Sequence, residues 1–242
     1  MIFVSFVSFV EINHKAHKEH KGPQREAMFY ETRARDKAIL PHDPFKAIIA
    51  PRPIGWISTR AKNGQINLAP YSFFNAFASM EAPIVGFSSE GFKDSAAFAE
   101  ESGEFVFNLA SHDLMKQMSE TSAPLPRGTS EFEHAGLTMA PCRLVAAPRV
   151  AEAHASLECK LTQVLRLKKH DGADLDNYLL LGEVVAFHLD DSLIRDGRFD
   201  TARARPLARC GYQDYAVVDG LIALPRPSGG GDAAGRPKTR PL

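Results

Sequence analysis

Apolar and polar residues alternate along several short stretches of the chain, and this alternation predicts half-buried β-strands. The first such stretch, IGWIST at 54–59, is followed by an Asn63–Gly64 turn and by QINLAP at 65–70. An Asn-Gly pair between two alternating stretches is a strong signal for a β-hairpin. Two further strands are predicted from IVGFSS at 84–89 and EFVFNLA at 104–110.

Two longer stretches alternate in the second half of the chain, at 154–167 and 178–191. Gly182 interrupts the second of them and indicates a bulge or a barrel kink. Between the early strands, KDSAAFAEESG predicts a helix that stops at Gly103, and HDLMKQMSE predicts a short one. The stretch 121–136 is rich in Pro, Gly and Ser, and it predicts a long loop of the kind that often has a functional role.

Strands outnumber helices in this pattern, and the connections are too short for repeated strand–helix–strand crossovers. We therefore expect a mainly β fold with peripheral helices, built as a closed or partly closed antiparallel barrel. The expected domain covers residues 28–224. Residues 1–27 are expected to be a non-native or disordered extension, because their apolar start lacks the positive charge and the cleavage pattern of a secretory signal. The Pro/Gly-rich residues 225–242 are expected to be a disordered tail.

Charge and composition narrow the class of protein. The chain has 242 residues with 29 basic and 29 acidic side chains, so its formal net charge is zero. Such a balance argues against general binding to nucleic acids or to a membrane surface. No apolar stretch reaches the roughly 18 residues that a membrane-spanning helix needs. The three cysteines lie far apart in the sequence, which favours free thiols in the cytoplasm over a disulfide framework or a metal site.

The chain lacks a nucleophile elbow, a phosphate-binding P-loop and a zinc-protease motif. It has instead small hydrogen-bonding residues at three strand ends, at 58–59, 72–75 and 88–89, followed by Lys93–Asp94–Ser95. A lysine and hydroxyl groups at a helix start suit a phosphomonoester. Asn and Ser side chains between aromatic residues suit a planar heterocycle, and the combination favours flavin mononucleotide (FMN).

Simpler roles compete with this interpretation. Asp94 or Ser95 could merely cap the predicted helix, which is the commoner role for these residue types. Trp56, Phe73 and Phe74 could belong to the core, because aromatic side chains mostly stabilise by burial. The residues by themselves therefore leave a cofactor site and a purely structural role open.

Several ordered motifs between about Pro44 and Gly211 resemble the flavin reductase-like family of FMN-binding split-barrel proteins, in its flavoprotein oxygenase-like branch. The matching pieces are PRPIGWIST, INLAPYSFFNAFA, PIVGFSS, KDSAAFAEESGEFVFNLAS, TSAPLPRGTSEFEHAGL, LECKLTQV and LLLGEVVAFHLDD. The resemblance implies a six-stranded Greek-key split barrel that forms a homodimer, with FMN near the dimer interface.

The resemblance also implies which residues bind the cofactor. The segments after the first strands are expected to contact the flavin ring and ribityl chain, and the later serines with the helix start are expected to hold the phosphate. Arg52 is a further candidate for the phosphate or the ribityl chain. The full expected set is Arg52, Ser58, Thr59, Ser72, Phe74, Asn75, Ser88, Ser89, Lys93, Asp94 and Ser95.

No catalytic acid, base or metal ligand is expected, because a flavin carries the electron-transfer chemistry itself. The leading hypothesis is an NADH- or NADPH-dependent flavin reductase that passes electrons to a small molecule or to a partner oxygenase. Arg127 and His134 in the 121–136 stretch could contact the nicotinamide cofactor or simply face solvent. One alternative is an electron carrier or oxygenase that holds FMN tightly and does not use NAD(P)H, and another is a non-catalytic dimeric binding module.

Overall fold

The structure is a computed structural model, and it describes residues 28–79, 81–126 and 129–225. Two compact units divide between Asp43 and Pro44. Residues 28–43 of the first unit contain no helix or strand, and an ion pair of 3.8 Å between Arg35 and Asp43 links two of their side chains. The predicted extension at 1–27 and most of the predicted tail lie outside the described residues.

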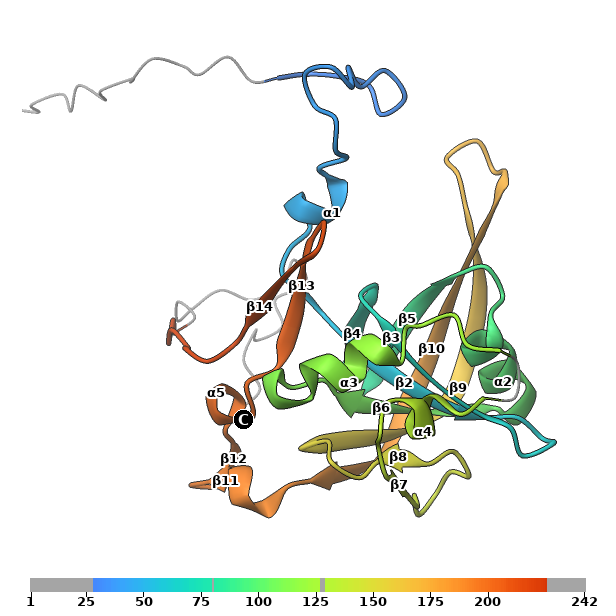
Figure 1. Cartoon of the computed structure of the whole chain (residues 1–242), viewed down its shortest axis with the longest axis vertical. Helices are drawn as coiled ribbons and strands as arrows, with labels where there is room; N and C mark the ends of the chain where they lie inside the picture. The colour runs from blue at the N-terminus through green and yellow to red at the C-terminus, as the bar shows by residue number, and fades with distance from the viewer. Residues whose placement is uncertain (1–27, 80, 127–128, 226–242) are drawn as a thin grey trace, which may run out of the picture. The chain divides into compact units, whose positions relative to one another are not determined.

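A seven-stranded antiparallel sheet forms the centre of the second unit, with strand order β3-β2-β6-β9-β10-β5-β4 (Figure 1). This confirms the predicted mainly β architecture. The strands are β2 (Gly55–Arg60), β3 (Ile66–Tyr71), β4 (Phe74–Ala78), β5 (Ile84–Glu90), β6 (Glu104–Leu109), β9 (Ala155–Lys168) and β10 (Asp174–Leu189).

The sheet has one strand more than the six expected, because the segment that follows the β2–β3 hairpin forms a strand of its own, β4. β3 ends at Tyr71 and β4 begins at Phe74, so that only Ser72 and Phe73 separate them. These two strands nevertheless occupy opposite edges of the sheet. A connection of two residues between opposite edges requires that the sheet curls until its edges approach each other. Ser72 and Phe73 therefore lie where the barrel is nearly closed.

Gly182 lies at an irregularity of the long β9–β10 pair, where the register shifts between Leu181 and Gly182. The predicted bulge is thus confirmed. A Cβ atom at Gly182 would lie 2.4 Å from the ring of Phe105, which is fully buried. The missing side chain therefore lets a core aromatic ring pack directly against the backbone of β10.

The two faces of β2 pack into different hydrophobic clusters. Trp56 on one face packs with Leu68 and Phe132, and Ile57 on the other packs with Phe87 and Phe105. Successive residues of a strand point to opposite faces, so the alternation in IGWIST divides its side chains between two cores. The same alternation places Ser58 and Thr59, the two polar residues that follow, on opposite faces of the strand. This determines where each of them lies relative to the candidate site.

Helix α2 (Asp94–Ser102) packs against β2, β3 and β6 beside the central sheet (Figure 1). It ends at Gly103, whose φ of 74° lies in the left-handed region that glycine adopts without strain, as predicted. The predicted short helix is also present, as a 3₁₀ turn (His112–Leu114) followed by α3 (Met115–Glu120).

The stretch 121–136 is not one long loop, which corrects the prediction. Within it Glu131–His134 forms the short helix α4, and the Ser130 side chain accepts a hydrogen bond from the Glu133 amide at 3.4 Å. This serine cap three residues before Glu133 is a helix-start signal that the Pro/Gly-rich composition concealed.

Smaller elements complete the described part of the second unit. A three-stranded sheet of order β1-β13-β14 pairs Arg52 with Arg209. No helix among the described residues combines the length and apolar character needed to span a bilayer. The remaining elements are α1 (Phe45–Ile48), β1 (Arg52–Pro53), β7 (Met139–Ala140), β8 (Arg149–Val150), a 3₁₀ turn (Asp191–Leu193), β11 (Ile194–Arg195), β12 (Arg198–Phe199), α5 (Thr201–Ala204), β13 (Leu207–Gly211) and β14 (Asp214–Val217).

Candidate functional site

A cavity of about 450 Å³ lies where strand β3, the start of helix α2 and the segment after α3 meet. This volume falls within the range of roughly 300–1,000 Å³ that is usual for small-molecule sites. We call it the main cavity. Its lining includes three residues predicted from sequence, Lys93, Asp94 and Ser95. The other lining residues are Asn67, Ala69, Pro70, Tyr71, Thr121, Ser122, Ala123, Pro124, Leu125 and Glu131.

The side chain of the N-cap residue does not cap the start of helix α2. The N-cap residue is Lys93, which has an extended backbone and makes no side-chain hydrogen bond to the first turn. The N–H groups of a first helical turn have no partner within the helix and carry partial positive charge. Lys93 itself is exposed, while Ser95 is almost fully buried. This helix start therefore presents a cation, a hydroxyl group and backbone amides at the cavity.

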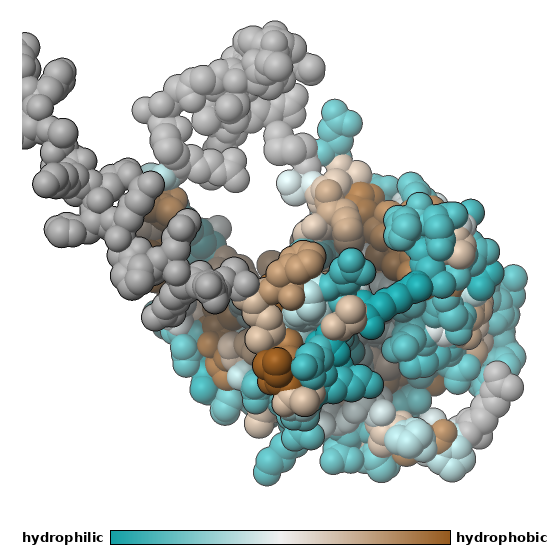
Figure 2. Space-filling view, turned by 90° about the horizontal axis from the view of Figure 1, so that it is seen from above, coloured by the Kyte–Doolittle hydropathy of each residue, from teal (hydrophilic) through white to brown (hydrophobic). Residues whose placement is uncertain are grey.

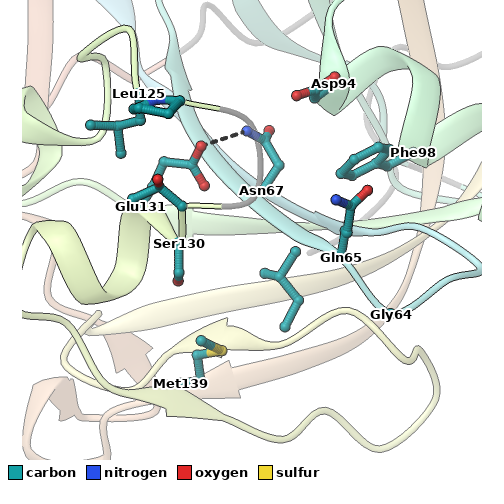
Figure 3. Close-up of a pocket in the computed structure, with 12 residues that line it drawn as sticks. Gly64, Gln65, Asn67, Asp94, Phe98, Leu125, Ser130, Glu131 and Met139 are labelled. Carbon is teal, nitrogen blue, oxygen red and sulfur yellow. Dashed lines mark hydrogen bonds between the residues drawn. The ribbon is translucent and has the colours of Figure 1, made fainter.

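A chain of hydrogen bonds crosses the cavity wall from helix α2 to helix α4. The Ser95 hydroxyl donates to Oδ1 of Asn67. Nδ2 of Asn67 donates in turn to Oε1 of Glu131 at 3.2 Å (Figure 3). The second oxygen of Glu131 accepts from the Leu68 amide, also at 3.2 Å. Asn67 thus lies between a hydroxyl group and a carboxylate, and it connects three segments that are distant in the sequence.

Tyr71 and Ser89 add hydroxyl groups to the same region. Burial raises the pKa of the Tyr71 phenol, and side-chain hydrogen bonds with Ser95 and Ser89 oppose that rise only in part. The phenol consequently stays protonated at neutral pH and remains a hydrogen-bond donor. Ser89 is fully buried at the end of β5, and its hydroxyl group donates to the carbonyl oxygen of Gly91 at 2.8 Å. The hydroxyl groups of Tyr71, Ser95 and Ser89 therefore lie close together, and Tyr71 and Ser95 also line the main cavity.

The structure separates Ser58 from Thr59, although the two are neighbours in sequence. Thr59 pairs with Asn67 across the β2–β3 ladder, so it lies on the face of the sheet that Asn67 occupies. Its hydroxyl oxygen is buried and has no hydrogen-bond partner. Ser58 lies on the opposite face, where its hydroxyl donates to the Pro148 carbonyl at 2.5 Å and accepts from Asn108 at 3.2 Å.

The predicted ring-binding residues lie beyond the Tyr71 end of β3 and do not line the main cavity. Ser72 is half-buried. Ser88, which the resemblance assigns to the phosphate, is also half-buried and does not line the main cavity. Phe74 stacks on Phe107, with ring centroids 4.8 Å apart and planes at 2°. Asn75 is exposed on edge strand β4, where its side-chain oxygen accepts from the Ala76 amide at 2.8 Å.

Arg52 is buried, and only part of its guanidinium group is satisfied. NH1 donates to the carbonyl oxygens of Lys46 and Ile49, whereas Nε and NH2 have no hydrogen-bond partner. The guanidinium carbon lies 5.6 Å from the centroid of the Phe73 ring. Arg52 is thus held at the nearly closed edge of the barrel and not in the main cavity.

Sequence reasoning did not single out Asn67, Tyr71, Thr121 or Glu131 as site residues. Asn67 could have been found from the hairpin register, because it is opposite Thr59. Two loop residues are candidates for contact with the nicotinamide cofactor, and the structure describes only one of them. His134 faces Glu120 at 3.4 Å and does not line the main cavity, and Arg127 lies outside the described residues.

A second polar cluster, Cys142, Glu158 and His188, brings together groups that can ligate metals. Its geometry has another explanation, because the buried Glu158 carboxylate accepts from the amides of Arg143 at 2.8 Å, Leu144 at 2.6 Å and Val145 at 3.0 Å. It also contacts His188 Nε2 at 2.6 Å. The carboxylate therefore anchors a loop to the sheet.

These contacts shift the acidity of two members of the cluster. Burial alone would raise the pKa of Glu158, but the hydrogen bonds from the Arg143 amide and from His188 outweigh it, so that the pKa lies below its ordinary value. Burial, and to a lesser extent the charge of Glu158, raise the pKa of the Cys142 thiol to about 12. The thiol therefore remains protonated at neutral pH.

Sequence and structure comparisons with known proteins point to the same family. A protein of unknown function from Halalkalibacterium halodurans is 35% identical over 185 residues, which cover 74% of this chain and 88% of that protein. Nitrilotriacetate monooxygenase component B from Bacillus cereus superposes with a TM-score of 0.74 at 29% identity, covering 82% of this chain and 98% of that one.

A split-barrel protein from Shewanella frigidimarina superposes with a TM-score of 0.72 at 22% identity, covering 83% of this chain and all of that one. The curled antiparallel sheet is accordingly a split barrel, as expected. The model of the flavin reductase like domain matches residues 49–207, which is more than half of the chain. This chain therefore belongs to the flavin reductase-like family.

Proposed function

We propose that this protein binds FMN and acts as an NAD(P)H-dependent flavin reductase. The observation that carries the proposal is the uncapped start of helix α2, which presents Lys93 and Ser95 to the main cavity. A phosphate group is satisfied at such a place by backbone amides, a hydroxyl group and a cation. The family of the chain supports the flavin part of the proposal.

The polar atoms in and around the main cavity fit a phosphate-bearing ligand. The buried Thr59 hydroxyl oxygen has no partner, and a buried polar atom without a hydrogen bond is costly unless something else satisfies it. Ser95, Ser89 and the Tyr71 phenol provide further hydroxyl groups nearby. We assign the phosphate of FMN to Lys93, Ser95 and Ser89, with Asp94 positioned in the same helical turn.

Strand β3 gives the proposed ligand a direction. Ser95 bonds to Asn67 near the start of this strand, and Tyr71 at its end leads into Ser72, Phe74 and Asn75. We assign the isoalloxazine ring to this end of the strand, and we assign the orphaned atoms of Arg52 to the ribityl chain. Ser88 stays a candidate for the phosphate. When bound, FMN supplies the electron-transfer chemistry, and the protein needs only to hold and orient it.

A homodimer is part of the proposal. Apolar side chains are exposed around β4 and the end of β10, including Phe73 at 42%, Phe77 at 54% and Phe187 at 59% exposure. Figure 2 shows apolar residues interspersed with hydrophilic ones on one face of the molecule. Exposed apolar surface commonly marks an interface. Sedimentation of a monomer at micromolar concentration, with FMN still bound, would contradict the dimer.

The electron acceptor is proposed from one comparison. Because a solved structure of similar fold is component B of a monooxygenase, we propose that this protein delivers electrons to a partner oxygenase or to a small molecule. Its location in the cytoplasm stays a prediction.

A visible spectrum followed by anaerobic addition of NADH or NADPH tests the function. We expect flavin absorption that bleaches within seconds of adding one of these donors. Flavin absorption that persists would favour the alternative of an electron carrier or oxygenase supplied by another donor. A colourless protein that fails to take up added FMN would favour a non-catalytic binding module and would contradict the proposal.

A further inference from the structure

Tyr71, the last residue of strand β3, contacts hydroxyl groups on two other elements. Its ring packs on the fully buried Phe87, with ring centroids 4.7 Å apart and planes at 46°. Its phenol makes side-chain hydrogen bonds with Ser95 in the first turn of α2 and with Ser89 near the end of β5. Tyr71 and Ser95 also line the main cavity. The phenol therefore lies beside the place assigned to the phosphate.

Both serine hydroxyls already use the single proton that a hydroxyl group can donate. Ser95 donates to Oδ1 of Asn67. The direction of this bond is fixed, because the nitrogen of the Asn67 amide donates to a carboxylate and leaves only the oxygen for Ser95. Ser89 donates to the carbonyl oxygen of Gly91 at 2.8 Å. Toward Tyr71 each serine can therefore only accept, and the phenol is the donor.

The three hydroxyl groups differ in what is lost when they turn toward a ligand. If Ser95 turned, Oδ1 of Asn67 would lose that hydrogen bond. If Ser89 turned, the Gly91 carbonyl would lose its bond in the same way. If the Tyr71 phenol turned, both serine hydroxyls would keep the bonds that they donate. An unpaired buried polar group is costly, so the phenol is the hydroxyl that can donate to a ligand at the lowest cost.

We propose that Tyr71 donates a hydrogen bond to the phosphate of FMN and so contributes to the preference of the site for FMN over riboflavin. This inference rests on the proposed function, which assigns the phosphate to Lys93, Ser95 and Ser89. A hydrogen bond to an ionised acceptor is stronger than one between two neutral groups, so a bound phosphate attracts the phenol proton more strongly than the serine oxygens do. Because burial raises the pKa of the phenol, that proton is present at neutral pH.

Tyr71→Phe tests the inference, because it removes the hydroxyl group and retains the ring that packs on Phe87. Titration of the full-length protein with FMN and with riboflavin, followed by flavin fluorescence, measures the effect. We expect FMN affinity to fall about tenfold, as for the loss of one hydrogen bond to a charged group, and riboflavin affinity to change less than about twofold. Equal losses for the two flavins would reveal a merely structural role and overturn the inference.

A double variant separates direct donation from an effect through Ser95. If Tyr71 only held Ser95 in place, Tyr71→Phe would weaken FMN binding no further once Ser95 is replaced by alanine. A direct bond from the phenol does not need the serine. We therefore expect Tyr71→Phe to weaken FMN binding at least about threefold in the Ser95→Ala background. The absence of a further loss would overturn direct donation.

Tyr178→Phe is the matched control. Tyr178 is likewise a half-buried tyrosine of the central sheet, but it lies on β10 and does not line the main cavity. We expect it to leave both flavin affinities unchanged, and a tenfold loss of FMN affinity in this control would contradict a specific role of Tyr71. Tyr71→Met, which also lacks a hydroxyl group, replaces Tyr71→Phe if circular dichroism shows that the latter does not fold.

The outcomes distinguish this inference from the proposed function. Wild-type protein that binds neither FMN nor riboflavin would overturn the proposed function and the inference with it. FMN binding as tight in Tyr71→Phe as in the wild type would overturn the inference alone and leave the proposed cofactor site standing.

Discussion

The Ser95 hydroxyl, in the first turn of helix α2, donates a hydrogen bond to the side-chain oxygen of Asn67 on strand β3. Because the amide nitrogen of Asn67 donates to Glu131, both ends of this amide are engaged and its orientation is fixed. One small side chain thus aligns the helix start, the strand and helix α4 around the main cavity.

Replacing Asn67 with leucine, which has a similar volume, tests this alignment. The half-buried Glu131 would keep only the Leu68 amide as a donor, and the Ser95 hydroxyl would lose its acceptor. We expect the free energy of unfolding to fall by about 1–3 kcal/mol, the usual cost of leaving buried polar groups unpaired. FMN affinity should weaken as well. Urea unfolding and FMN titration measure the two effects, and no change in either would contradict the aligning role of Asn67.

The double variant Lys93→Ala and Ser95→Ala tests where the phosphate binds. Charge-assisted hydrogen bonds contribute roughly 1.5–3 kcal/mol each, and the exposure of Lys93 places its contribution toward the lower end. We expect FMN affinity to fall by about tenfold or more while riboflavin, which has no phosphate, binds unchanged. Fluorescence titration with both flavins measures the difference.

Lys169→Ala provides the charge control for that experiment. Lys169 is an exposed lysine at the turn between β9 and β10, where its backbone amide bonds to Ala173. We expect FMN affinity close to that of the wild type. If the double variant binds FMN as tightly as this control, the phosphate has been placed wrongly.

Gly182→Ala should destabilise the barrel. The added Cβ would lie 2.4 Å from the Phe105 ring, so the ring or the strand must move. Overpacking of this kind costs about 1–3 kcal/mol of unfolding free energy. A second substitution, Phe105→Leu, should recover part of that loss because it removes the clashing ring atoms. Gly220→Ala, at a position with open space around it, should change stability by less than about 0.5 kcal/mol.

Glu158 should make stability depend on pH in the acid range. Its pKa is lower in the folded protein than the ordinary value of 4.5. The stability that it contributes is therefore complete above about pH 4.5 and is lost as the pH falls through the folded-state pKa. Urea midpoints of the wild type and Glu158→Gln should differ most at neutral pH and converge as the pH falls below the folded-state pKa of Glu158. A difference that stays constant over this range would show that the loop anchor does not depend on the carboxylate charge.

Local signals predicted the elements around the site well. The helix at α2 and its end at Gly103 follow from short-range features, namely a polar start and a glycine that adopts a positive φ. The alternation in IGWIST and the Asn63–Gly64 turn likewise predict the β2–β3 hairpin, because turn chemistry and strand periodicity act over a few residues.

Long-range features could not be predicted in the same way. Glu131 bonds to Asn67 across 64 positions of sequence, and no local pattern encodes that meeting. The Ser58–Thr59 pair shows a finer limit. The two hydroxyl residues are equally plausible in the sequence, and only the packing of Trp56 and Ile57 into different clusters determines which face each one occupies.

Trp56 is the only tryptophan of the chain, and it is fully buried with its indole nitrogen donating to the Thr121 hydroxyl at 2.9 Å. Thr121 also lines the main cavity. The protein thus carries one indole fluorophore, attached to the wall of the space assigned to its ligand. No other indole contributes to the tryptophan emission, so the intensity and wavelength of that emission report on this wall without any label.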